Sequence, residues 1–164
     1  MCVNDPKRNS RTFSKRVTAG EVYGHNNLGK PDDMSLPTFH MIDGAPQPVA
    51  TFSHASEIDG WVFLTGQMPT WPDDPDRPIP EGIEAQTRRV MDNLIIVLKG
   101  MGLSLRNVAQ ARVYITDFER DYNAMNMVYK TYFEEGKLPA RTCVGVTGLA
   151  VGALVEIDMV ARRP

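Results

Sequence analysis

The sequence of 164 residues contains little cysteine and little histidine. Its two cysteines, Cys2 and Cys143, lie at opposite ends of the chain and form no Cys-x-x-Cys pair. This spacing excludes a disulfide framework and favours a reducing compartment. The three histidines, His25, His40 and His54, lack the spacing of metal ligands. We therefore expect no metal site.

Long apolar runs and an excess of charge are also absent. No run approaches the roughly 18 apolar residues that a membrane-spanning helix requires. The first residues contain no apolar stretch typical of a secretory signal. The net charge of −2 creates no overall field that would attract nucleic acid. We therefore expect a cytoplasmic protein that binds neither membrane nor nucleic acid.

The first 35 residues differ in composition from the rest of the chain. They are rich in Asn, Ser, Gly, Pro and Asp, contain several basic residues and lack hydrophobic periodicity. Such a segment buries too little apolar surface to offset the entropy lost on ordering. We expect a flexible arm over residues 1–35 and one folded domain over residues 36–164. The arm weakly resembles an organelle transit peptide, but Asp5 and the scattered glycines disfavour an amphipathic helix there.

Short strands are predicted at the start of the domain. The side-chain pattern indicates strands at residues 38–42, 51–53 and 61–65. Asp59-Gly60, directly before the third of these, is typical of a tight hairpin turn. Residues 68–80 are rich in proline and aspartate, which predicts a loop.

Two amphipathic helices are predicted further along. Apolar residues recur every three or four positions in residues 81–101, and Gly100 and Gly102 mark the end of that helix. Asp117 is a typical N-cap for a second helix, which Gly136 is expected to end.

Alternating side chains predict three more strands, at residues 111–116, 142–147 and 154–161. The coarse order is three strands, a helix, a strand, a helix and two strands. This order predicts an α+β fold in which both helices cover one face of one sheet.

The last two strands contain the residues best suited to chemistry. Alternation places Arg141 and Cys143 on one face of their strand, and Glu156 on the face opposite to Val155 and Ile157. If the two strands pair as a hairpin, Glu156 can lie on the Arg141 face. Taken alone, an arginine beside a glutamate is more often a solvated ion pair than a site.

Longer patterns point to a family. Pro139-Ala140-Arg141-Thr142-Cys143-Val144, with Glu156 fifteen positions after the arginine, resembles the C-terminal signature of the Rid (YjgF) family. Four further segments resemble that family: residues 64–69 its SGQ-x-P element, residues 84–94 its AQ…LxN helix, Asn126 and Tyr129 its N-x-x-Y pair, and residues 46–50 its AP-x-PVGPYS entry segment. The resemblance extends over residues 38–163.

This resemblance implies a fold, an assembly and a reaction. The implied fold is the chorismate-mutase-like α+β fold, a mixed six-stranded sheet with two helices packed on one face. The implied assembly is a homotrimer whose active sites lie between subunits. The implied reaction is the hydrolytic deamination of reactive enamines and imines, such as 2-aminoacrylate and 2-imino acids, to 2-keto acids and ammonia. No cofactor is expected.

The chemistry of two residues suits this reaction. The planar guanidinium of Arg141 can bind the carboxylate of an imino acid through two parallel hydrogen bonds. Glu156 can orient a water molecule and accept a proton as the water adds to the C=N carbon. We therefore predict that Arg141 and Glu156 are the catalytic residues.

Four further positions correspond to substrate-binding positions of the family: Phe52, Gly66, Asn126 and Cys143. Phe52 stands where the family usually has a tyrosine, so a hydroxyl is missing and the pocket should be more apolar. Gly66 suits a close approach of backbone to ligand. Cys143 is equally well explained as a small buried side chain, and Asn126 as a helix-surface hydrogen-bonder.

Several functions remain open. A broad imino-acid deaminase is the leading hypothesis. Phe52 and the extended loop, in which Trp71 could form an aromatic wall, favour a pathway-specific enzyme such as a 2-aminomuconate deaminase. A regulatory trimer that binds small carboxylates without turnover would need only Arg141. Ribonuclease activity is the weakest hypothesis, because the sequence contains neither a histidine pair nor a basic aromatic stripe.

Overall fold

The computed structural model describes residues 35–164, so the arm predicted for residues 1–35 lies, except for Ser35, outside the described residues. The described part contains two helices and six strands, with short 3-10 helices η2 (Leu105–Asn107), η3 (Lys130–Tyr132) and η4 (Ala150–Gly152). The predicted order of strands and helices is confirmed. The elements are β1 (Thr38–His40), β2 (Ala55–Ile58), β3 (Trp61–Gln67), α1 (Ile83–Gly100), β4 (Val108–Ile115), α2 (Phe118–Tyr129), β5 (Ala140–Gly145) and β6 (Val155–Arg162).

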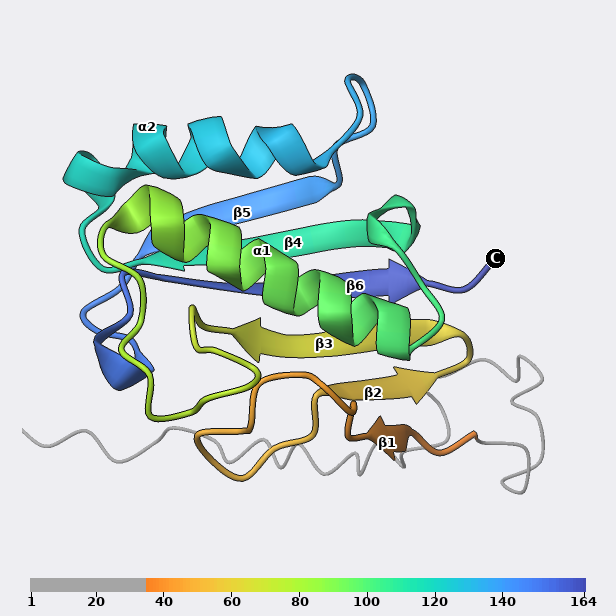
Figure 1. The fold of residues 1–164 in the computed structure, drawn as a ribbon. Helices are drawn as coiled ribbons and strands as arrows, with labels where there is room; N and C mark the ends of the chain where they lie inside the picture. Colours follow the sequence, from red (N-terminus) through yellow and green to blue (C-terminus); the bar gives the residue numbers. More distant parts are fainter. Residues whose placement is uncertain (1–34) are drawn as a thin grey trace, which may run out of the picture. The chain divides into compact units, whose positions relative to one another are not determined.

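All six strands form one mixed sheet in the order β1-β2-β3-β6-β4-β5. β4 and β5 are parallel, and every other neighbouring pair is antiparallel. Parallel neighbours require a crossover connection, which α2 supplies between β4 and β5. Both helices lie on the same face of the sheet (Figure 1). The predicted α+β fold, with a mixed six-stranded sheet and two helices on one face, is confirmed.

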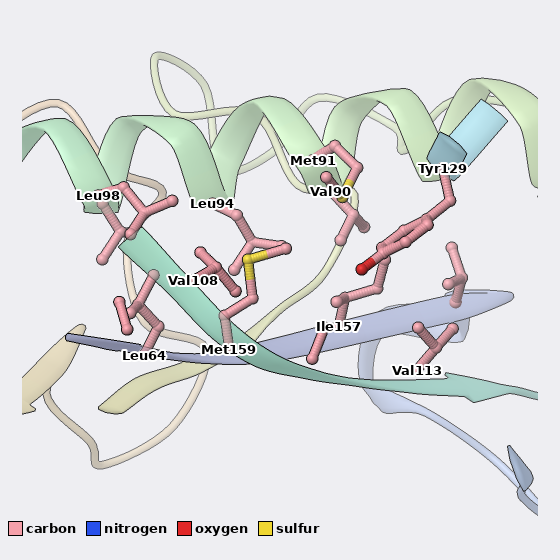
Figure 2. Packing of buried hydrophobic residues seen from close by; sticks show 14 of the residues in the cluster. Leu64, Val90, Met91, Leu94, Leu98, Val108, Val113, Tyr129, Ile157 and Met159 are labelled. Carbon is pink, nitrogen blue, oxygen red and sulfur yellow. The ribbon is translucent and has the colours of Figure 1, made fainter. Parts of the chain in front are cut away.

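The core lies between α1 and the covered face of the sheet. Leu94 and Leu98 of α1 meet Leu64, Ile157 and Met159 of the strands in one cluster (Figure 2). The side chains of this cluster are almost completely buried, and each such burial contributes roughly 1.5–3 kcal/mol. The alternation of β3 and β6 therefore sends one set of side chains into the core and leaves the other set on the open face of the sheet.

Local signals in the sequence predicted several turns and helix ends correctly. Asp59 and Gly60 have positive φ angles of 50° and 74° and join β2 to β3 as a tight turn. α1 ends at Gly100, and Gly102 has a φ of 70° and donates its N–H to the carbonyl of Lys99 at 2.9 Å. The carboxylate of Asp117 caps α2 by accepting the N–H of Arg120 at 3.2 Å.

Two predictions of local structure were wrong. Residues 51–53 form no strand; β2 begins at Ala55 instead. The reason is that the ring of His54 bonds this part of the chain to the backbone of residues 42–46, which replaces strand pairing there. The second helix ends at Tyr129 rather than near Gly136, because η3 tightens the chain directly afterwards.

The expected pairing of the last two strands was also wrong. β5 and β6 do not form a hairpin, because β4 lies between them and pairs with both. The crossover through α2 brings β5 to the edge of the sheet, and the chain then returns past β4 to form β6. This arrangement decides which faces Arg141 and Glu156 occupy.

Within residues 35–164, no helix is long and apolar enough to cross a membrane.

Candidate active site in two halves

Arg141 lies on the helix-covered face of the sheet. It pairs with Ala111, a fully buried residue of β4, and side chains of paired residues point to the same face. Its guanidinium carbon lies 4.9 Å from the centre of the Tyr129 ring on α2. Among residues 35–164, no carboxylate forms an ion pair with Arg141. The guanidinium is therefore held by an aromatic ring and keeps its donors for an external anion.

Tyr129 supports Arg141 with its ring rather than its hydroxyl. The side chain is 2% exposed and extends from α2 into the core (Figure 2). Its hydroxyl has no hydrogen-bond partner in the described part of the chain. Burial raises the pKa of Tyr129 to about 12, although the charge of Arg141 acts in the opposite direction. The phenol is therefore neutral and unsuited to acid–base work near neutral pH.

Asn126 and Cys143 flank this half of the site. Asn126 is half-buried and precedes Tyr129 by three residues, so the two share one side of α2. Cys143 shares the Arg141 face of β5 and packs against the core. Burial raises the pKa of the Cys143 thiol, with Arg141 opposing the shift. A protonated thiol is a poor nucleophile, which agrees with a lining role.

Glu156 lies on the opposite, open face. It pairs with Tyr114 on β4, while its neighbours Val155 and Ile157 point into the core. Glu156 is half-buried. Burial, and then the negative charge of Asp158, raise the pKa of its carboxyl group above the ordinary value. Such a shift brings a carboxylate closer to the pKa that a general base needs near neutral pH.

Gly66 leaves the space that the Glu156 carboxylate occupies. It lies where the pairing of β3 with β6 shifts register between Leu64 and Gln67. A Cβ atom at position 66 would overlap the Glu156 carboxylate. Glycine is therefore required here for close approach, and the carboxylate lies directly against the β3 backbone.

An ionic network next to Glu156 was missed in the sequence. Arg112 donates its Nε–H to both oxygens of Asp158, at 2.9 and 3.1 Å, and the Tyr114 hydroxyl donates to Asp158 at 3.3 Å. These residues face the open side of β4 and β6. The signal available in the sequence was that Arg112 and Tyr114, and likewise Glu156 and Asp158, lie two positions apart with an apolar residue between them.

Phe52 and Gly66 line one hollow next to Glu156, together with the segment Pro46–Val49. The hollow keeps its shape because His54 holds that segment. Nδ1 of His54 accepts the N–H of Ile42 at 2.8 Å, so Nε2 carries the ring proton and donates to the carbonyl of Pro46 at 2.9 Å. His54 is thus a structural residue.

Hydrogen bonds from α1 hold the loop after β3, and its aromatic residue, Trp71, has its hydrogen-bond partner within that loop. Asn93 of α1 donates to the carbonyls of Met68 and Thr70 at 2.9 and 2.8 Å. Trp71 bonds the carbonyl of Pro78 within its own loop and stacks under the guanidinium of Arg77 at 3.7 Å. Met68 and Thr70 line the hollow, whereas Trp71 does not. The expectation that Trp71 forms an aromatic wall of the active site therefore stays a prediction.

Arg141 and Glu156 therefore lie on opposite faces of the sheet, and the expectation that they share a face is wrong. Arg141 pairs with Ala111, whereas Glu156 pairs with Tyr114, three residues further along β4. The two strands are separated by β4, so the backbones lie roughly 10 Å apart across the sheet and about 10 Å apart along it. Within one copy of the chain, the two side chains cannot contact the same small substrate.

The comparisons with known proteins assign the family. A family model described as "Endoribonuclease L-PSP", the YjgF/RutC/Rid family, matches residues 42–163. The chain belongs to this family. The matched range contains all six candidate residues, in both halves of the site. A RutC family protein of Pyrococcus abyssi is 37% identical over 120 residues, which cover 73% of this chain and 91% of that protein.

Two other members of the Rid family have more informative names. The 2-iminobutanoate/2-iminopropanoate deaminase of Mus musculus is 32% identical over 117 residues, covering 71% of this chain and 84% of that protein. The crystal structure of E. coli TdcF with bound serine aligns with a TM-score of 0.71 and 29% identity, covering 77% of this chain and 99% of that chain. The Rid family thus includes a named imino-acid deaminase and a member that has been crystallised with a small amino acid.

Proposed function

We propose that this protein hydrolyses reactive enamine and imine intermediates, 2-aminoacrylate and 2-imino acids, to 2-keto acids and ammonia. We further propose that the site lies between subunits of a homotrimer. The observation that carries the proposal is the separation of the two halves. Arg141 on the covered face and Glu156 on the open face suit the same reaction, but they can act on one substrate only if two copies of the chain supply them.

The chemistry follows from the surroundings of each residue. The Arg141 guanidinium, held over the Tyr129 ring, binds the substrate carboxylate through two hydrogen bonds. Glu156 accepts a proton from water as the water oxygen bonds to the carbon of the protonated imine (C=NH2+), which gives a neutral carbinolamine. Glu156 then returns this proton to the nitrogen and accepts the hydroxyl proton as the C=O bond forms, the C–N bond breaks and ammonia leaves. The raised pKa of Glu156 suits it to both proton transfers.

The open face of the sheet supports self-association. Trp61, Phe63 and Val144 are large apolar residues that are 41%, 44% and 41% exposed, and strand alternation places them on the face away from the helices. Large apolar side chains exposed on one face of a sheet favour an interface. Burying this face against a second copy would carry Glu156 into the interface, where the Arg141 edge of a neighbour can reach it.

Phe52 favours a second, more specialised substrate. Its ring contributes no hydroxyl to the hollow that it lines with Gly66, so this wall offers apolar contact in place of a hydrogen bond. The hollow itself holds only about 10 Å³, so a larger unsaturated amino acid such as 2-aminomuconate would contact Phe52 from a site that a second copy of the chain enlarges. Binding of carboxylates without turnover, and cleavage of RNA, are the alternatives that the experiments must distinguish.

The first experiment measures turnover. A PLP-dependent dehydratase generates 2-aminoacrylate in situ, and its decay is followed with wild type, Arg141→Ala and Glu156→Gln. We expect each variant to lose about 10²–10⁴-fold in acceleration, because one positions the substrate and the other activates water. Glu119→Gln, an exposed position in the first turn of α2, is the matched control and should keep full activity. Wild type without activity on small imino acids and on 2-aminomuconate would overturn the proposal; carboxylate binding or RNA cleavage would then identify the alternative.

The second experiment tests whether the site is shared. Arg141→Ala and Glu156→Gln chains, each inactive alone, are mixed, unfolded and refolded together. In a ring of three, a site formed by an Arg141 from one chain and a Glu156 from its neighbour recovers about a quarter of the wild-type activity. A site contained in one chain recovers none. If mass measurements show that mixed trimers have formed and no activity is recovered, the shared site is excluded. The proposed deaminase reaction would not be affected by that result.

A further inference from the structure

A large groove opens at the C-terminal end of α1, separate from both halves of the candidate site. It lies between the last turn of α1, η2 and residues 133–139, which lead into β5. Its volume is about 700 Å³. This volume falls within the range of about 300–1,000 Å³ typical of small-molecule sites. None of the six candidate site residues lines the groove.

The walls of the groove are mostly apolar. Leu98, Leu105, Val108, Phe133 and Leu138 line it. Leu98 belongs to the core, whereas Leu138 is 55% exposed, so the apolar surface runs from the interior of the domain out to solvent. A ligand with an apolar body would remove this surface from water, which favours binding.

The rim of the groove carries an excess of positive charge. Lys99, Arg106 and Lys137 line it together with a single acidic residue, Glu134. Hydrogen bonds from Lys137 and then Arg106 hold the pKa of Glu134 below its ordinary value, so this carboxylate is ionised. The four side chains therefore sum to two positive charges. Among residues 35–164, no carboxylate pairs with Lys99.

The ion pairs at the rim are exchangeable. Glu134 pairs with both Arg106 and Lys137, whose side chains are 79% and 68% exposed. Ion pairs this exposed contribute little free energy and reform easily with another anion. A ligand carboxylate can therefore bind Lys99 and recruit either of the other two cations at little cost.

The end of α1 does not oppose an anion here. The carbonyl oxygens at a helix C-terminus normally carry partial negative charge. In this helix the carbonyls of Leu98 and Lys99 accept the N–H groups of Leu103 and Gly102 at 2.8 and 2.9 Å. The Arg163 guanidinium donates to the carbonyl of Met101 at 3.0 Å. The carbonyls of Leu98, Lys99 and Met101 are thus occupied, and the Arg163 guanidinium lies beside them.

We propose that this groove is a second ligand site, which binds a small carboxylic acid with an apolar body. The acid's carboxylate bonds Lys99 at the rim, and its hydrocarbon part lies against Leu105, Phe133 and Leu138. The site is independent of the proposed deaminase reaction, because it shares no residue with either half of that site. The two sites also differ in chemistry. The groove offers a lysine beside a large apolar surface, whereas the candidate site offers Arg141, stacked on an aromatic ring, to a small and polar substrate.

Octanoate is a suitable probe, with 1-octanol as the uncharged molecule of equal chain length. Isothermal titration of the full chain should show saturable octanoate binding and at least tenfold weaker binding of octanol, because only the acid pairs with Lys99. Arg141→Ala should bind octanoate as wild type does, since the groove lies apart from Arg141.

Two charge reversals form a matched pair. Lys99→Glu should raise the octanoate dissociation constant at least about tenfold, because it turns an attraction at the rim into a repulsion. Lys130→Glu changes the net charge equally, but Lys130 is exposed and does not line the groove. It should change the constant less than about twofold. Both positions are on the surface, so both variants should fold.

Four binding results would overturn the proposal, and so would one change in the assembly. They are the absence of saturable octanoate binding, loss of binding in Arg141→Ala, equal binding of octanol and octanoate, and equal effects of the two charge reversals. The proposal would also fail if Lys99→Glu, but not Lys130→Glu, lowered the mass of the assembly below that of the wild type. That result would make the groove an interface between copies of the chain.

Discussion

The two faces of the sheet are built from the same strands but differ in almost every physical property. On the covered face, Leu64 and Met159 pair across β3 and β6 and are 4% and 0% exposed. On the open face of the same strands, Phe63 is 44% exposed and Glu156 carries a half-buried carboxyl group. In these two strands the covered face stabilises the domain, whereas the open face leaves Glu156 accessible and carries the apolar side chains that we propose pack against another copy. A mutation should therefore act according to its face rather than its strand.

Adjacent residues of β3 give the sharpest test of this difference. Leu64→Ala removes buried side-chain atoms from the core and should lower the free energy of unfolding by about 2–5 kcal/mol. Phe63→Ser, one position earlier and on the other face, should leave the fold intact but reduce the mass of the assembly, because it removes apolar surface from the proposed interface. Urea unfolding and light scattering at several concentrations measure the two effects separately.

The comparison would fail if Phe63→Ser kept the wild-type assembly. A trimer that persists in this variant would mean that the open face is not the interface, and the shared site would need another surface. The concentration series is essential, because loss of assembly by itself lowers the apparent stability of an oligomer.

Gly66 tests how closely Glu156 must lie against β3. Gly66→Ala introduces a Cβ atom into the space of the Glu156 carboxylate, so the carboxylate must move. We expect kcat to fall about 10- to 100-fold with little change in the far-UV circular dichroism spectrum. Gly148→Ala is the matched control, since a Cβ atom there would meet no heavy atom within 4 Å. If Gly66→Ala were as active as the wild type, the reaction would not depend on the Glu156 carboxylate lying where the structure places it.

The smallest predicted effect is a change in pH dependence. As a base, Glu156 acts only when ionised, so its raised pKa moves the acidic limb of the rate profile towards neutral pH. Asp158→Asn removes a neighbouring negative charge and leaves Arg112 without its partner. Both changes lower the pKa of Glu156, so the limb should move to lower pH. If the acidic limb of the rate profile stays in place or moves to higher pH in Asp158→Asn, then a group other than Glu156 sets that limb.

The same shift affects stability with a defined sign. The folded state binds the Glu156 proton more tightly than the unfolded chain does, so this group favours folding below its unfolded pKa. That contribution is lost as the pH rises through the folded pKa. The pH range in which Glu156 can act as a base is therefore one in which it no longer stabilises the fold.

Local patterns predicted much of the fold because their causes are local. Asp59-Gly60 adopts the positive φ angles of a tight turn, Asp117 caps α2, and Gly102 ends α1. Each of these depends on residues within four positions along the chain. The short strand predicted at residues 51–53 failed for the opposite reason. A side chain, His54, bonds the backbone of residues 42–46 there, and no periodicity in the sequence reveals such a bond.

The sequence by itself determined the family, the order of strands and helices, and the residue types that suit the chemistry. Alternation also placed Arg141 and Glu156 correctly within their own strands. Only the tertiary structure decided how those strands relate, because strand pairing is set by contacts between distant segments and not by any single strand. With β4 between β5 and β6, the registers of the two pairings put the arginine on one face and the glutamate on the other. The candidate site that looked continuous in the sequence thus becomes two halves, which in our proposal a second copy of the chain joins.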